Sequence, residues 1–195
     1  MTKTVLKLAL LLLVALPVFA QTSEFGFSLG GVQRRRSTIE KDAGLDQNGF
    51  WDFSDSAKEV YFAIQLEPGT RFKVKAGQVD TATVFVTDPS IPKDADNKRD
   101  RYTIFDNGRI EHVEGIMDYR FSEPFGSTGL FAGAGLYRQT GGNHSETDYG
   151  LTFGVNGDFP INPRFGVVVE GAYHWTHMET RPTFVTATVG LRVSF

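Results

Sequence analysis

The sequence contains no cysteine, so it forms neither disulfides nor thiolate metal sites. It also lacks an apolar run of the roughly 20 residues that a membrane-spanning helix needs, because its longest run, Leu8–Leu16, is far shorter. An excess of basic residues is missing as well, since the formal net charge is −3. These three absences argue against a disulfide scaffold, a helical membrane protein and a nucleic-acid binder.

The first 20 residues have the layout of a secretory signal peptide. Lys3 and Lys7 precede the apolar run, Pro17 ends it, and the small residue Ala20 stands at the expected cleavage point. We predict cleavage there, which leaves residues 21–195 as one mature domain and moves the net charge from −3 to −5, because two lysines and no acids are removed. An uncleaved anchor is the alternative.

The last 13 residues, TFVTATVGLRVSF, alternate between apolar and polar side chains, as in a strand with two different faces. The apolar face comprises Val185, Ala187, Val189, Leu191, Val193 and Phe195. A strand that ends on an aromatic ring fits a boundary between lipid and water better than it fits bulk water.

The same period of two recurs through the rest of the mature chain and predicts further strands. The predicted strands lie within residues 24–32, 59–66, 71–76, 112–121, 127–138, 148–159, 164–175 and the C-terminal segment. Only the glycine- and alanine-rich fifth segment, Ser127–Arg138, has no face assignment.

The predicted strands are joined by connections that alternate between short and long. The short ones, Glu67–Thr70, Glu123–Gly126 and Pro160–Pro163, all carry proline. The other four, which are longer or polar, are Gln33–Ala57, Thr81–Asn107, Gln139–Glu146 and Thr176–Pro182. This asymmetry, with both termini at the end of the short turns, is typical of an all-β, eight-stranded antiparallel up-and-down transmembrane β-barrel.

Aromatic residues on the apolar faces gather at the two ends of the predicted strands. At the end of the short turns stand Phe25, Phe72, Tyr119, Phe121, Phe159, Phe165 and Phe195. Near the opposite end stand Tyr149, Tyr173 and Trp175. Two such rings around an aliphatic band are the pattern expected at two lipid–water boundaries.

The polar faces would line the interior of a barrel, which is just wide enough for side chains to fill. They carry charges of both signs: Glu59, Arg71, Lys73, Lys75, Glu114, Asp118, Arg120, Asp148, Asp158, Arg164, Glu170 and Arg192. Buried charges require partners. Counting residues from the ends of neighbouring strands, we predict that Lys73 lies near Asp118 and Lys75 near Glu114.

The terminal strand ending at Phe195, together with the signal peptide and the strand pattern, resembles small bacterial outer-membrane barrels of the OmpA, OmpX and OmpW type. The resemblance covers residues 24–195 and implies location in the cell outer membrane, with its lipid and lipopolysaccharide as partners. It also implies that the barrel-assembly machinery recognises the C-terminal strand ending at Phe195, and that the protein is a monomer. We expect no peptidoglycan-binding domain after Phe195, which would distinguish the protein from full-length OmpA proteins.

The histidines His112, His144, His174 and His177 are candidates for acid–base chemistry. His174 shares a strand face with Glu170, which suits either an acid–base pair or a hydrogen-bonded network inside the barrel; we favour the network. Barrel enzymes such as the lipid A deacylases need a serine beside the histidine, and here only Thr176 is close in sequence. We therefore assign no catalytic, cofactor-binding or metal-binding residues and expect no cofactor.

Other motifs in the connections are weak. Asp46–Gly49 partly matches a calcium loop but lacks its acidic spacing and closing glutamate. No helix follows Gly30-Gly31 or Gly133–Gly135, so a nucleotide site is not expected. Basic residues at the predicted outer rim fit either lipopolysaccharide phosphates or plain solvated loops; these are Arg34, Arg35, Arg36, Lys98, Arg99 and Arg101.

The sequence thus predicts an integral outer-membrane barrel with a structural or surface-interaction role and no catalysis. One alternative is passage of small hydrophobic compounds, as in OmpW-like barrels, which an apolar pocket in the outer half of the barrel would favour. A second is a lipid A-modifying barrel enzyme. A soluble lipocalin would instead place apolar side chains inside and charges outside.

Overall fold

The computed structural model describes residues 22–34, 55–80, 83–87, 102–106, 108–142, 144–178 and 183–195. Over these ranges the chain forms ten strands. They are β1 (Ser23–Arg34), β2 (Asp55–Glu67), β3 (Thr70–Asp80), β4 (Thr83–Thr87), β5 (Tyr102–Asp106), β6 (Arg109–Glu123), β7 (Gly126–Gly141), β8 (His144–Pro160), β9 (Phe165–Thr176) and β10 (Thr183–Ser194). No helix in the described ranges has the length and apolarity of a membrane span. The predicted signal peptide lies outside these ranges and stays a prediction.

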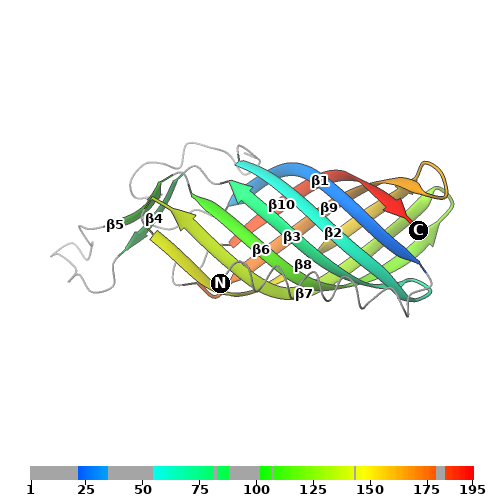
Figure 1. Ribbon diagram of the computed structural model, residues 1–195, viewed down its shortest axis with the longest axis horizontal. Helices are drawn as coiled ribbons and strands as arrows, with labels where there is room; N and C mark the ends of the chain where they lie inside the picture. Colours follow the sequence, from blue (N-terminus) through cyan, green and yellow to red (C-terminus); the bar gives the residue numbers. More distant parts are fainter. Residues whose placement is uncertain are drawn as a thin grey trace.

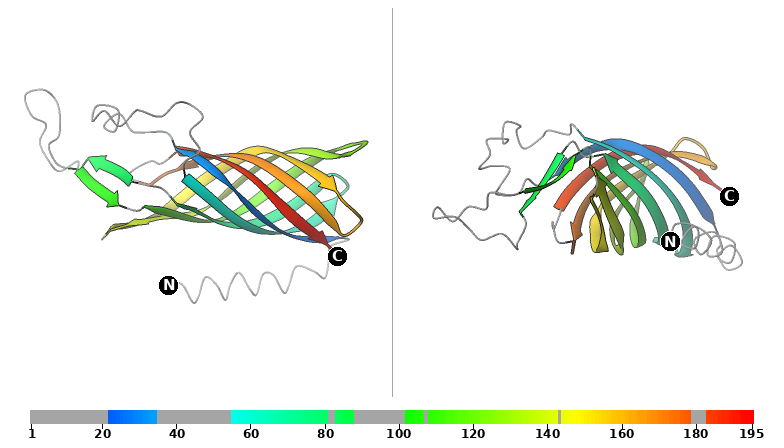
Figure 2. Two further views of the ribbon diagram at one scale, coloured as in Figure 1. Left: turned by 90° about the horizontal axis from the view of Figure 1, so that it is seen from above. Right: turned by 60° about the vertical axis from the view of Figure 1, so that its left-hand side comes forward.

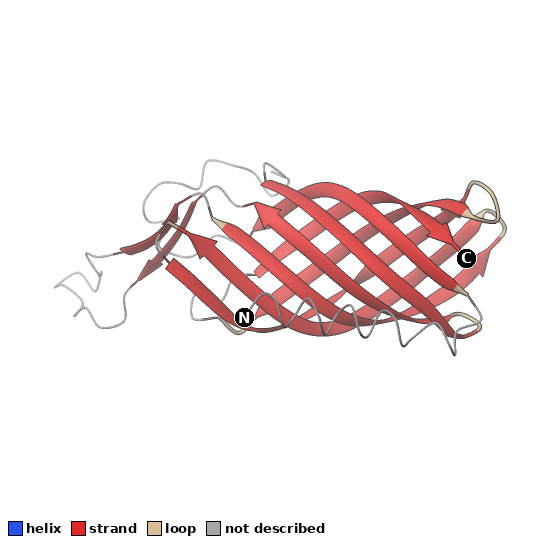
Figure 3. Cartoon of the chain, viewed as in Figure 1, coloured by secondary structure: helices blue, strands red, loops and turns tan. Residues whose placement is uncertain are grey.

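Eight of the strands form one closed barrel, in which all neighbours are antiparallel (Figures 1 and 3). The order around the barrel is β1-β10-β9-β8-β7-β6-β3-β2. The first and last strands close it, and their ends are held by reciprocal backbone hydrogen bonds between Ser23 and Phe195, at 3.1 and 3.0 Å. Closure leaves no barrel strand with an unpaired edge. The predicted eight-stranded antiparallel barrel is therefore confirmed.

Three tight turns lie at the end of the barrel that carries the C-terminus (Figure 2). The β2–β3 turn is Pro68-Gly69, where a φ of 79° suits glycine, and the β6–β7 turn is Pro124-Phe125. The β8–β9 turn is stabilised by Asn162, whose side-chain oxygen accepts the backbone N–H groups of Arg164 and Phe165, each at 2.9 Å. The short connections are confirmed. Arg164 lies exposed in this turn, however, so its predicted inward orientation is wrong.

The opposite end differs from the prediction at two connections. β7 runs to Gly141 and β8 begins at His144, so the predicted longer connection Gln139–Glu146 is a tight turn, with Gly142 at φ 53°. Within the predicted loop Thr81–Asn107, β4 and β5 pair as a separate two-stranded sheet (Figure 1). The alternation of apolar and polar side chains weakens where both faces of a strand meet water, although the backbone pairing continues there. The sequence therefore underestimates strand length at this end.

The outer surface of the barrel is an apolar band. On β8, Tyr149, Leu151, Phe153, Val155 and Phe159 are exposed to between 47 % and 56 %, whereas the alternate polar residues are buried. On the other strands the band includes Phe25, Phe27, Leu29, Val60, Val113, Tyr119, Phe121, Leu130, Leu136, Phe165, Val169, Val189, Leu191 and Phe195. The predicted outward orientation of these faces is confirmed.

A belt of polar side chains ends the band on the side away from the chain termini. Lys58 pairs in register with Gln78, Gln78 with Glu111, Glu111 with Arg138, and Arg138 with Thr147. These residues occupy the outward-facing positions of five adjacent strands at one level. The apolar surface therefore stops at the same height around this half of the barrel.

The fifth barrel strand, β7, acquires its faces from pairing rather than from its own sequence. Leu130, Ala132, Ala134 and Leu136 point outward, while Phe131 and Tyr137 are buried inside, at 3 % and 0 % exposure. Small residues on the outer face give weak alternation of hydropathy. The short β6–β7 turn sets the register and hence decides which face is buried.

Replacement of Gly30 by alanine is expected to lower the free energy of unfolding by about 1–3 kcal/mol, as overpacking does. Gly30 faces inward, and a Cβ there would lie 1.9 Å from the backbone oxygen of Ala187, which only a backbone shift can relieve. The matched control is Gly171→Ala, whose Cβ would meet nothing nearer than a methyl of Val155 at 3.8 Å. Urea unfolding of both variants in detergent tests the prediction, and equal stabilities would contradict it.

Candidate functional site

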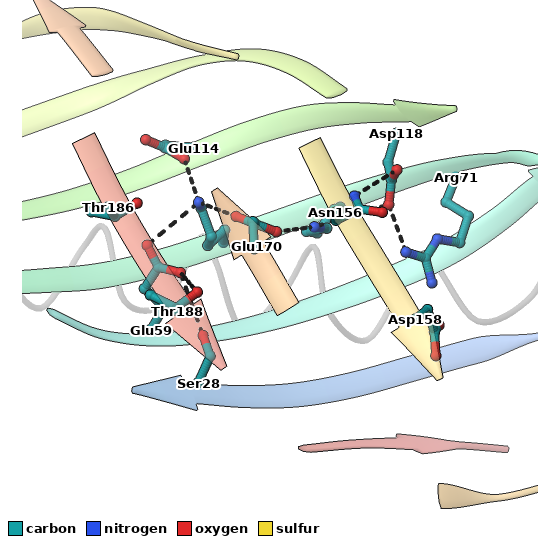
Figure 4. A network of polar contacts seen from close by, with 12 residues as sticks. Ser28, Glu59, Arg71, Glu114, Asp118, Asn156, Asp158, Glu170, Thr186 and Thr188 are labelled. Carbon is teal, nitrogen blue, oxygen red and sulfur yellow. Dashed lines mark hydrogen bonds and ion pairs between the residues drawn. The ribbon is translucent and has the colours of Figure 1, made fainter. Parts of the chain in front are cut away.

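The interior of the barrel holds a network of buried and half-buried charges contributed by β1, β2, β3, β6, β8, β9 and β10 (Figure 4). Its members are nearly free of solvent contact; Lys73 and Asp118, for example, are both 0 % exposed. Isolated charges at this depth would be strongly destabilising, so each requires an oppositely charged neighbour. The network has two groups of ion pairs along the barrel and a cluster of imidazoles and aromatic rings beyond them.

The first group lies toward the chain termini. Arg71 binds Glu24 and, at 2.5 Å, Asp118, while the amide of Asn156 donates to Asp118 at 3.0 Å. A second carboxylate, Asp158, receives hydrogen bonds from Arg120 and from Arg192, the latter at 2.7 Å. These guanidinium–carboxylate contacts fill the interior at this end.

The second group, in the middle of the barrel, centres on two lysines of β3. Lys73 and Lys75 each bind Glu170 at 2.8 Å. Lys75 also lies 3.5 Å from both Glu59 and Glu114. The ring of Phe131 lies beside both ammonium groups, at 5.1 Å from Lys73 and 5.6 Å from Lys75. One ammonium group therefore contacts carboxylates from three different strands.

The two predicted lysine pairs are both found, with different geometry. Lys75 stands directly opposite Glu114 in the β3–β6 register, as predicted. Asp118 instead stands opposite Arg71, and it reaches Lys73 diagonally at 3.9 Å. The main partner of Lys73 is therefore Glu170, which lies on the non-adjacent strand β9 and is contacted across the interior. Register alone does not reveal such a contact.

Beyond the lysines, two histidines and a tyrosine surround Glu114. Its Oε1 lies 3.0 Å from His174 Nδ1 and 3.1 Å from His112 Nδ1, and it accepts a hydrogen bond from the hydroxyl of Tyr137. The ring of His112 stacks on that of Tyr137, with centroids 5.5 Å apart. His112, Glu114 and His174 are the three residues in the described ranges whose donor atoms are grouped closely enough to hold a metal ion.

The partner considered for His174 in the sequence, Glu170, does not contact it. The two residues are four positions apart on β9, which separates them by about 13 Å along an extended strand, and Glu170 binds the lysines instead. His174 belongs to the interior network, as favoured, but through Glu114, Tyr137 and Thr186. The carboxylate comes from β6, which no spacing within β9 indicates.

The hydropathy of Ser127–Arg138 does not indicate that Tyr137 faces the interior of the barrel. The short turn at Pro124-Phe125 places Tyr137 directly opposite His112 in the β6–β7 register. Counting residues outward from that turn would have placed the tyrosine inside, because His112 was already assigned to the inward face. The position of the turn thus predicts which face of β7 is buried, whereas the hydropathy of the strand does not.

Thr186, His174 and Glu114 together have the order of a nucleophile, a base and an orienting acid. Thr186 Oγ1 lies 3.1 Å from His174 Nε2, and Glu114 lies on the other ring nitrogen. The threonine is only 1 % exposed, and the ring of Phe184 stacks on His174 at 4.5 Å. A substrate has no access to the hydroxyl in this conformation, so the contact serves to orient the histidine.

An apolar cluster occupies the interior just beyond the histidines, at the end away from the termini. It comprises Val32, Ala57, Val79, Ile110, Tyr137, Met178 and Phe184. All seven side chains are at most 1 % exposed, so they pack against one another and close the barrel here. The apolar residues expected of a conduit are therefore present in the half of the barrel away from the termini, but their side chains fill the interior there.

His177 lies outside the network, on the rim. Its ring stacks on Tyr149 at 4.7 Å, and its Nδ1 lies 3.0 Å from Asp148. Hydrogen bonds from His177 and from the backbone N–H of Tyr149 hold the pKa of Asp148 below its usual value. The proposed calcium-like motif and most of the basic rim residues lie outside the described ranges: Asp46–Gly49, Arg35, Arg36, Lys98, Arg99 and Arg101.

No protein-family model matches this sequence, and no curated protein matches it. Among solved structures, the fold is similar to Neisserial surface protein A, with 12 % identity and a TM-score of 0.58 over 89 % of this chain and 96 % of that one. It is also similar to the N-terminal β-barrel domain of OprF from Pseudomonas aeruginosa, with 10 % identity and a TM-score of 0.54 over 90 % and 98 %. The chain therefore has the fold of small eight-stranded outer-membrane barrels.

Proposed function

We propose that this chain is an integral outer-membrane barrel with a structural or surface-interaction role and no catalytic activity. The observation that carries the proposal is the apolar band on the outside of a closed barrel. On β8 the band runs from Tyr149 to Phe159, which matches the about 9–11 residues of a tilted transmembrane strand. A water-soluble barrel would not expose such a band around its circumference.

The orientation of the side chains argues against a soluble carrier. Leu151 and Val189 are 47 % and 55 % exposed on the outer surface, whereas the charges are buried inside. A lipocalin requires the reverse arrangement, because its ligand binds in an apolar interior. A hydrocarbon environment satisfies both faces of this barrel at once.

The packed interior favours a structural or surface role over passage of small molecules. Ion pairs cross the middle of the barrel, and the apolar cluster closes the end away from the termini. Passage of small hydrophobic compounds stays an alternative because that cluster is apolar, but it requires Met178 and Phe184 to move. Uptake of a hydrophobic dye by liposomes containing the protein distinguishes the two functions.

The partners follow from the proposed location. Outer-membrane lipid would contact the band, lipopolysaccharide would contact the outer rim, and the barrel-assembly machinery would bind β10 with its terminal Phe195. The ring of Phe195 is 69 % exposed, which would suit an aromatic residue at a lipid–water boundary. We further propose that the protein acts as a monomer, because the closed barrel satisfies its own backbone hydrogen bonds.

Cell fractionation combined with gel electrophoresis tests the proposed location. On a density gradient, we expect the protein to sediment with outer-membrane marker proteins. Unheated samples in mild detergent should migrate differently from boiled ones, because a closed barrel with an interior ion network resists unfolding at room temperature. Recovery in the soluble periplasmic fraction would refute the membrane assignment, whatever the migration.

A further inference from the structure

His112 is a buried imidazole without a hydrogen bond of normal geometry. It is 2 % exposed, and within the described part of the chain neither ring nitrogen makes a hydrogen bond of ordinary geometry. Its Nδ1 nevertheless points toward Glu114, 3.1 Å from Oε1. Buried side-chain nitrogens are almost always partnered, since burial without a partner loses the bonds made with water. A buried histidine whose Nδ1 meets a carboxylate in poor hydrogen-bond geometry, close to a second histidine, therefore calls for a physical reason.

The three groups converge as metal ligands do. The donor atoms of His112, Glu114 and His174 all lie within 4.8 Å of one another, and the two Nδ1–Oε1 separations are 3.0 and 3.1 Å. Tetrahedral Zn²⁺ with bonds of about 2.0–2.1 Å holds neighbouring ligand atoms about 3.3 Å apart. Two of the three separations are thus close to those around a bound ion, and the third, at most 4.8 Å, would have to shorten by up to about 1.5 Å.

We propose that His112, Glu114 and His174 bind one divalent transition-metal ion, with Zn²⁺ as the best match to two imidazoles and one carboxylate. Thr186 would act as the supporting group for His174. Its hydroxyl lies 3.1 Å from Nε2, so it can accept that N–H and leave the Nδ1 lone pair directed at the ion. The hydroxyl of Tyr137 lies 3.0 Å from His174 Nδ1, next to the proposed site.

The charges around the cluster are consistent with a bound cation. Three carboxylates, Glu59, Glu114 and Glu170, share the ammonium groups of Lys73 and Lys75, which leaves one negative charge in excess. Lys75 contacts Oε2 of Glu114, whereas the histidines face Oε1. The carboxylate therefore presents one oxygen to the lysine and the other to the proposed ion.

The site is closed to solvent, which determines how it must be loaded. Phe184 stacks on His174, and Met178 of the same apolar cluster is fully buried. We expect the ion to enter while the barrel folds and to exchange slowly afterward. The metal must therefore be offered both to the folded protein and during refolding.

The experiment uses tag-free protein extracted in detergent, treated with chelator, and offered Co²⁺ as a spectroscopic probe or Zn²⁺. Each ion is added to the folded barrel and, separately, to urea-unfolded chain before refolding. The background is the double variant His144→Gln/His177→Phe, which leaves His112 and His174 as the only histidines. The phenylalanine keeps a ring stacked on Tyr149 and removes the rim imidazole.

We expect one Co²⁺ per refolded chain, with the intense visible absorption of a four-coordinate site, and a higher unfolding temperature with Zn²⁺. Adding His112→Phe, which keeps a ring over Tyr137, should weaken binding at least 10-fold. Absence of bound metal in the double-variant background under both loading conditions would identify a hydrogen-bonded imidazole cluster only and overturn the proposal. Because that background retains all three proposed ligands, this result stands even if the His112→Phe variant fails to fold.

Discussion

Replacement of Lys75 by methionine is expected to lower the free energy of unfolding by about 3–5 kcal/mol, the usual cost of removing one partner from a buried ion pair. Lys75 is 1 % exposed and is the ion-pair partner of Glu59, Glu114 and Glu170. Methionine fills a similar volume, so the loss measures charge rather than packing. Glu170 would then keep Lys73, whereas Glu59 and Glu114 would lose their lysine partner, and the carboxylates would repel one another across the interior.

The matched control is Lys58→Met, at the outer surface. Lys58 pairs with Asp80 at 3.6 Å, but its side chain is 55 % exposed, so its loss should cost only about 0–1 kcal/mol. Both variants are unfolded in urea from the same detergent, with the heat-modifiable gel shift as the measure of folded barrel. Equal destabilisation by the two substitutions would show that the interior network does not stabilise the fold.

Replacement of Val189 by arginine should cost about 2–4 kcal/mol in a lipid bilayer, the value for a cation at mid-depth on the lipid face of a barrel. Val189 is 55 % exposed and pairs in register with Leu29 on one side and Val169 on the other. An arginine at this position has no polar neighbour at the same level. Hydrocarbon would thus surround its guanidinium group.

The control for depth is Thr183→Arg, on the same face of the same strand. Thr183 stands opposite Trp175 at the outer boundary of the band, where an arginine costs about 0–1 kcal/mol. Refolding of both variants into lipid vesicles gives the comparison. If both variants refold with the stability of the parent protein, the band does not lie in hydrocarbon, and the proposed location is wrong.

The sequence predicted the strand number and the orientation of seven strands because lipid and packed interior select different side chains at alternate positions. The prediction failed where the two faces of a strand do not differ in hydropathy. Beside the β7–β8 turn, Thr140 and Gly141 are half-buried and Gly142 and Ser145 are exposed, so the hydropathy does not alternate there and predicts a longer connection. In β7, alanines and glycines fit either face, so the hydropathy does not show that Tyr137 faces inward. The pairing of β7 with β6 determines that orientation.

The candidate metal site illustrates the same limit. His112 and Glu114 were assigned inward from β6, and His174 from β9, so the ligand types and their faces were known. The sequence does not indicate that the three side chains meet, because β6 and β9 are not neighbours in the barrel. Contacts across the interior depend on how the strands close around it, which no spacing along one strand contains.

The sequence by itself determined which side of each strand is apolar and that the strands close into a barrel of eight, since these follow from local alternation and turn length. Only the tertiary structure decided which charges pair across the interior, as Lys73 and Glu170 do, and that an apolar cluster closes one end. Those features arise from side chains that meet across a closed interior, where the positions of all eight strands enter together.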